Sequence, residues 1–193
     1  MSESNILKRE FNYLTKTSEA NAILSSLRLY ITVDQNQPFN SAGLAFEVTL
    51  VNEANESKTI RNILDTVQIK LQDEEGWPLK LPVGSPPRIL INSPAKIEYP
   101  FLIDSFRSVS GNFNLTDKID ESEFTIEGNA SYNYNFRIDR IQDIPREKFQ
   151  ETTTKTKTLN KGKYKIDVLI DILSQESIGH KLCESGPIEI SFN

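Results

Sequence analysis

The chain has 193 residues, of which 37% are hydrophobic and 9% are aromatic, so it can bury one substantial core. Its formal net charge is -5 at pH 7. This acidic balance disfavours nucleic acids and anionic membrane surfaces as partners, because both attract clusters of lysine and arginine. We therefore expect no binding of nucleic acid.

The cysteine content and the hydropathy pattern predict a cytoplasmic protein. The first residues lack the apolar run of a signal peptide, and no window is apolar over the length needed to cross a bilayer, so we expect no membrane insertion. Cys183 is the one cysteine in the chain and cannot form an internal disulfide.

The N-terminal segment, residues 1–26, is predicted to be a partly helical or mobile arm. Ile6, Leu7, Phe11 and Leu14 recur at roughly helical spacing, and Thr17 or Ser18 could cap a short helix over Glu19–Ser25. The alternative is a strand over Phe11–Thr15. Residues 27–193 are predicted to form a single domain.

The rest of the chain carries the period-two alternation of half-buried strands, separated by turns rich in Gly, Pro, Asn and Asp. Predicted loops are Trp77–Pro94, with at most an edge strand over Arg88–Ile91, and Ser105–Ser122, Gln142–Thr152 (a loop or a short helical turn) and Ser174–Ser185. Predicted strands are Leu27–Val33, Leu44–Val51, Thr59–Leu64, Val67–Leu71, Ala95–Ile103, Phe124–Ile141, Glu151–Thr158, Lys163–Leu173 and Gly186–Phe192.

Many strands with hardly any helix predict an all-β fold, and specifically an immunoglobulin-like antiparallel β-sandwich. With one cysteine, the chain cannot form the Cys–Trp–Cys core of antibody-type domains. The expected likeness is therefore to the broader immunoglobulin-like group.

Three sequence motifs resemble one known family. A strand ends in Val48–Asn52, an acidic turn with glycine precedes an aromatic residue in Asp73–Trp77, and Leu159–Tyr164 leads into a late strand. The chain thereby resembles the bacterial intracellular proteinase inhibitors of the BsuPI type. The resemblance implies a small intracellular sandwich that inhibits a protease, and it assigns no functional residue.

The single histidine, His180, lies three residues before Cys183. A catalytic pair would need a nucleophile and an orienting carboxylate around the histidine, and no such pattern surrounds it. A metal site that combines the two with Glu184 would have only two of the soft ligands that structural zinc prefers. We interpret His180 as a loop residue beside a small apolar cysteine, and we predict no catalytic residue.

Two acidic segments invite a calcium interpretation, because clustered carboxylates can bind Ca²⁺. One is the turn Asp73–Glu75, and the other comprises Asp117, Asp120, Glu121 and Glu123. The spacing of an EF-hand is absent. We interpret both as solvated acidic loops and predict no metal and no cofactor.

Two aromatic groups have alternative interpretations. Tyr132, Tyr134 and Phe136 share one parity, which favours core packing over an exposed stacking surface. Trp77, between an acidic turn and Pro78, is either a plug of the sandwich or an exposed anchor for a partner.

These observations predict a non-enzymatic protein-binding module, in one specific form an intracellular proteinase inhibitor. The candidate contact residues are Trp77, Pro78, Pro86 and Pro87, and Glu151–Thr158 is a candidate exposed edge. The alternative is a structural subunit of a larger assembly, with the N-terminal arm docked on a neighbour. A homo-oligomer is compatible with either hypothesis, whereas an enzyme is the least favoured class.

Overall fold

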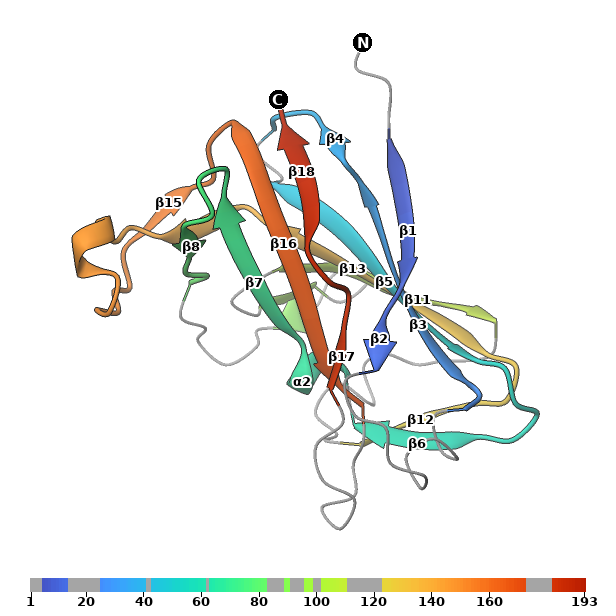
Figure 1. Cartoon of the computed structure of the whole chain (residues 1–193). Coiled ribbons are helices and arrows are strands. Elements are labelled where there is room, and N and C mark those ends of the chain that lie inside the picture. The colour runs from blue at the N-terminus through green and yellow to red at the C-terminus, as the bar shows by residue number, and fades with distance from the viewer. Residues whose placement is uncertain are drawn as a thin grey trace.

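The computed structural model describes residues 5–13, 25–40, 43–61, 63–82, 89–90, 96–98, 102–110, 123–172 and 182–193. These residues form an all-β, sandwich-like fold with two seven-stranded sheets (Figure 1). The strand pairs are antiparallel except for β4 beside β18, which is parallel. The predicted all-β class is thereby confirmed.

The first sheet has the strand order β1–β3–β5–β13–β11–β10–β9. In β3 and β5 every second residue is buried and those between are more exposed, because one face of the sheet packs on the core. The strands are β1 (Ile6–Glu10), β3 (Leu27–Asp34), β5 (Leu44–Asn52), β13 (Ser131–Ile138), β11 (Leu102–Ser110), β10 (Lys96–Glu98) and β9 (Ile89–Leu90).

The second sheet has the strand order β2–β17–β16–β18–β4, and β7 pairs with the other side of β16 and with β8. The long strand β16 forms its centre, with β17 and β18 paired to successive parts of the same edge. The strands are β2 (Asn12–Tyr13), β17 (Leu182–Glu184), β16 (Gly162–Asp171), β18 (Ile188–Phe192), β4 (Asn36–Gln37), β7 (Gln68–Asp73) and β8 (Pro78–Leu79).

Two small sheets and two short helical turns complete the described fold. β6 (Lys58–Arg61) pairs with β12 (Glu123–Ile126), and β14 (Arg140–Gln142) pairs with β15 (Thr156–Thr158). The helical turns are α2 (Ile63–Thr66) and the 3₁₀ turn η2 (Arg146–Lys148). Among the described residues, no helix has the length and apolar character that a membrane span requires.

The core lies between the two sheets. Leu29 and Ile31 of β3, and Ile166 and Ile170 of β16, have no exposed surface. The predicted core role of Tyr132, Tyr134 and Phe136 is confirmed, since all three are buried. Phe136 also stacks on its cross-strand neighbour Phe46, with ring centroids 5.1 Å apart.

The first strands of the chain belong to both sheets. β1 pairs with β3 in the first sheet, and β2 pairs with β17 in the second. Between them Phe11 is 3% exposed, and its N–H donates to the carbonyl of Leu29 at 2.8 Å. The helical interpretation of Ile6 to Phe11 is therefore wrong, because these residues form a strand and a buried corner.

The β1 side of the sandwich is also held by side chains. Arg9 donates to the carbonyls of Ser185 at 3.3 Å and Pro187 at 3.1 Å, which connects the first sheet to the second. The predicted helix over Glu19–Ser25 lies, up to residue 24, outside the residues that the structure describes. The predicted division of the chain at residue 26 stays a prediction.

Other differences from the sequence prediction concern short elements. Ser105–Ser110 belongs to β11 and is not a loop, while residues 111–122 lie outside the described residues. Ala95–Ile103 contains two strands that pair with each other, with Ile97 opposite Ile103. Phe124–Ile141 is divided into β12, β13 and β14, and Ile63–Thr66 is helical.

Candidate functional site

The hairpin of β7 and β8 carries Trp77 at its tip. One carboxylate oxygen of Asp73 accepts the N–H groups of Glu75 at 3.1 Å and Trp77 at 2.8 Å. The N–H of Asp73 donates to the carbonyl of Trp77 at 3.0 Å. Gly76 has φ 80°, and this left-handed conformation favours glycine. The turn therefore fixes the backbone from which the indole projects.

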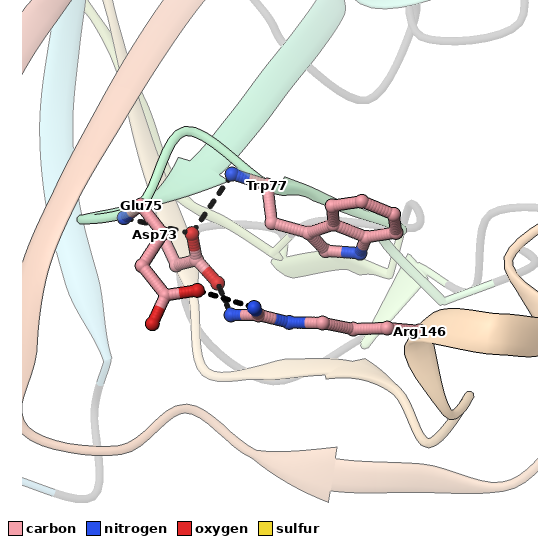
Figure 2. A network of polar contacts seen from close by, with 4 residues as sticks. All are labelled: Asp73, Glu75, Trp77 and Arg146. Atoms are coloured by element: carbon pink, nitrogen blue, oxygen red, sulfur yellow. Dashed lines mark hydrogen bonds and ion pairs between the residues drawn. The ribbon is translucent and has the colours of Figure 1, made fainter.

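Arg146 lies about seventy residues further along the chain and contacts this turn through its side chain (Figure 2). Its guanidinium donates to the second carboxylate oxygen of Asp73 at 2.8 Å and forms a short ion pair with Glu75. The hydrogen bond to Glu75 raises the pKa of Arg146 above its ordinary value, so the side chain stays charged. The half-buried Asp73 and the exposed Glu75 thus share one cation.

Aromatic contacts extend this cluster. The rings of Trp77 and Phe149 meet edge to face, with centroids 5.8 Å apart. The guanidinium of Arg146 lies 5.5 Å from the Trp77 ring centroid, and Figure 2 shows the arginine side chain running along the indole. The ammonium of Lys80 lies 4.8 Å from the Phe149 centroid and donates to the carbonyl of Glu151 at 2.8 Å. Edge-to-face and cation–π contacts of this kind favour one orientation of the rings.

The segment that bears Arg146 and Phe149 is anchored by Gln142. The N–H of Gln142 donates to the carbonyl of Lys80, and its amide group donates to the carbonyl of Leu81, both at 2.8 Å. Its amide oxygen accepts the N–H of Thr153 at 3.2 Å. Gln142 is buried, so these bonds are shielded from competing water.

Trp77 is exposed and is not a plug of the sandwich. It is 36% exposed, lies outside the core cluster, and is followed by the exposed Pro78. We call the group of Trp77, Pro78, Arg146 and Phe149 the Trp77 surface. A cavity of about 250 Å³ opens beside it, between the β7–β8 hairpin and the β14–β15 pair, and Ile141 and Tyr164 contribute to its lining.

The other predicted contact residues are not part of the Trp77 surface as the structure describes it. Pro86 and Pro87 lie outside the described residues. The candidate edge Glu151–Thr158 is a strand only over Thr156–Thr158, where β15 pairs with β14 and its side chains are exposed.

The Cys183 thiol is poorly suited to nucleophilic chemistry. It is fully buried in β17, and burial, with a smaller contribution from the charge of Asp171, raises its pKa to about 12. A protonated, buried thiol is a weak nucleophile, because the thiolate is the reactive form. His180 lies outside the described residues.

Arg146 already engages Asp73 and Glu75 of the acidic turn Asp73–Glu75, which argues against the calcium interpretation. Within the described part of the chain, no group of three or more His, Cys, Asp or Glu side chains is placed to hold a metal ion. Of the second acidic segment, Glu123 is an exposed residue of β12, and Asp117, Asp120 and Glu121 lie outside the described residues.

Comparison with known proteins adds no relative. The sequence matches no protein-family model, and neither a curated protein nor a solved structure is significantly similar to it. The resemblance to BsuPI-type inhibitors therefore stays a prediction from the three sequence motifs.

Proposed function

We propose that the protein is a non-enzymatic protein-binding module and that the Trp77 surface contacts the partner. The observation that carries this proposal is a tryptophan, 36% exposed and outside the core, that is held by Arg146 and Phe149. Tryptophan and arginine are the residues most enriched among the energetic centres of protein interfaces. Because the indole is already oriented, binding would cost little side-chain entropy.

The immunoglobulin-like version of the fold and the inhibitor version of the function belong to this proposal. Antiparallel sheets packed face to face support the first. The second is supported only by the motifs Val48–Asn52, Asp73–Trp77 and Leu159–Tyr164, two of which flank or contain parts of the site. The inhibitor version predicts a stable complex with an intracellular serine protease, in keeping with the predicted cytoplasmic location.

The alternative of an assembly subunit with a docked arm receives less support. Residues 6–13 of that arm are already paired with β3 and β17 of their own chain. An arm that docks on a neighbour would have to leave these partners or use only its outer edge.

The test is quantitative affinity capture from an extract of the source organism. The baits are the wild type, Trp77→Ala and the control Phe39→Ala, which removes an aromatic side chain that is 43% exposed at a different place. We expect a partner that the wild type and Phe39→Ala retain equally and that Trp77→Ala loses. Retention of every captured protein by Trp77→Ala would remove the Trp77 surface from the proposal. Recovery of a serine protease would select the inhibitor version.

A further inference from the structure

We propose that β1 is a self-association edge, and that two copies of the chain pair there antiparallel, with the twofold axis at Arg9. The two first sheets would then join into one continuous sheet. The inference does not rest on the Trp77 surface, because β1 lies on the opposite side of the molecule from β8 and β15 (Figure 1).

Among the described residues, nothing pairs with one side of the β1 backbone. The N–H of Gln35 donates to the carbonyl of Asn5, and the N–H of Phe11 donates to the carbonyl of Leu29, both at 2.8 Å. These bonds flank the β1–β3 ladder, in which inward and outward backbone groups alternate. The N–H and C=O groups of Ile6, Lys8 and Glu10 therefore point away from β3. Within the described chain no further strand pairs with β1.

The side chains of these same three residues are exposed, whereas Leu7 and Arg9 are half-buried. An unpaired strand edge with exposed side chains is a template for pairing with another chain.

The charges on β1 select the register. With the axis at Arg9, Lys8 of each copy lies directly opposite Glu10 of the other, so the pairing gains two cross-strand ion pairs. With the axis at Lys8, two lysines would lie directly opposite each other. Opposite charges across a strand pair stabilise it and like charges destabilise it.

The intrachain contacts of these residues leave their charges available. Lys8 lies over the ring of Tyr30 at 4.8 Å, and Glu10 meets Arg28 at 3.4 Å in an exposed ion pair. Exposed pairs of this kind are weak. With this axis the two Arg9 residues also lie opposite each other, but each guanidinium is turned toward its own copy, where it donates to the carbonyls of Ser185 and Pro187.

The edge at β15 shows the opposite pattern. The N–H of Asp143 donates to the carbonyl of Lys155, and the N–H of Leu159 donates to the carbonyl of Asp139. The backbone N–H and C=O groups of Thr156 and Thr158 therefore point away from β14. An axis at Thr156 would place Lys155 opposite Lys157, and an axis at Lys157 would place that lysine opposite itself. Lysines thus protect β15 from self-pairing, so of these two edges β1 is the one that fits a second copy.

The experiment is sedimentation equilibrium of the full chain over a range of concentrations at low salt. We expect a concentration-dependent dimer of the wild type. Lys8→Glu and Glu10→Lys should each weaken it about tenfold or more, because each places like charges opposite each other twice. An equimolar mixture of the two variants should restore dimers, since every facing pair is then complementary. The double variant Lys8→Glu/Glu10→Lys should dimerise like the wild type for the same reason.

Lys165→Glu is the control, because it changes the same charge on the second sheet, beside Glu189, and should leave the dimer intact. Circular dichroism checks that each exposed-site variant is folded. A wild type that stays monomeric over the whole range overturns the proposal. So do single variants that dimerise as well as the wild type, and a mixture that remains monomeric.

Discussion

The core and the Trp77 surface are stabilised by different kinds of interaction. Between the sheets, burial of aliphatic and aromatic side chains provides the stabilisation, and almost every inward position is apolar. At the Trp77 surface the same chain uses ion pairs, a side-chain-stabilised turn and ring contacts, with Arg146 and Glu75 both exposed. The core therefore provides the stability of the fold, whereas the polar cluster sets the orientation of one tryptophan side chain.

The largest expected effect comes from Phe11→Ala. Phe11 is buried between β1 and β2, so its removal leaves a cavity and should lower the free energy of unfolding by about 3–5 kcal/mol. Urea denaturation measures the change. The matched control is Ile6→Ala, which truncates an exposed residue of the same strand and should cost less than about 0.5 kcal/mol. Equal effects of the two variants would show that the first strands are not part of the core.

Alkaline pH should destabilise the interior before it affects the Trp77 surface. Burial raises the pKa of Tyr13, Tyr134 and Cys183, for Cys183 from 9.0 to about 12. The folded state therefore keeps protons that the unfolded state releases, so the contribution of Cys183 is fully present below pH 9.0 and is lost as the pH rises toward about 12. Urea midpoints measured from pH 8 upward should fall, and they should fall less in Tyr134→Phe than in the wild type.

The same buried thiol gives a simple reactivity assay. Native protein at pH 8 should react with a thiol reagent far more slowly than urea-unfolded protein, because Cys183 is buried and protonated. The absorbance of the coloured group that the reagent releases, followed over time, measures both rates. Rapid modification of the native chain would mean that β17 separates readily from its neighbours β2 and β16.

Gly76→Ala should have a smaller effect, confined to the hairpin. No atom lies within 4 Å of an added Cβ, so the cost comes from φ 80° alone and amounts to about 1 kcal/mol. Gly76→Asn should cost less, because asparagine tolerates the left-handed conformation better. If alanine and asparagine were equivalent, the turn would have a different conformation in solution.

Arg146→Ala should change the stability least and the local order most. Global unfolding should move little, because the ion pairs with Asp73 and Glu75 are at the surface. The indole should become more mobile and more accessible, since it loses the neighbour at 5.5 Å. Because Trp77 is the one tryptophan, its fluorescence anisotropy and quenching by acrylamide report on this site alone. Unchanged quenching would show that Phe149 suffices to orient the indole.

The sequence predicted the long strands well but did not assign the strands to sheets. Alternation over Leu27–Val33, Leu44–Val51 and Lys163–Leu173 is a local pattern that burial of one sheet face imposes, and the corresponding strands are present. The apparent helical spacing of Ile6, Leu7 and Phe11 arises because Phe11 belongs to a corner between two strands in different sheets. The spacing of apolar residues along the sequence cannot show that the chain passes from one sheet to the other.

The candidate site was predicted in part. Trp77 stood out because it is the one tryptophan and follows a recognisable turn. Arg146 and Phe149 gave no such signal, since their partners lie about seventy residues earlier in the chain. For Gln142–Thr152 the sequence left a loop and a short helical turn open, and the structure has the 3₁₀ turn η2 there.

The pairing of β2 with β17 has a consequence for how the chain folds. Cys183 and Tyr13 face each other in this ladder although they are about 170 residues apart. Contacts of such high sequence separation slow folding, because a large loop-closure entropy must be overcome before they form. During synthesis, residues 12–13 leave the ribosome long before their partner strand exists. The second sheet is therefore completed only after nearly all of the chain has emerged, and until then the start of the chain is open to chaperones and to premature association.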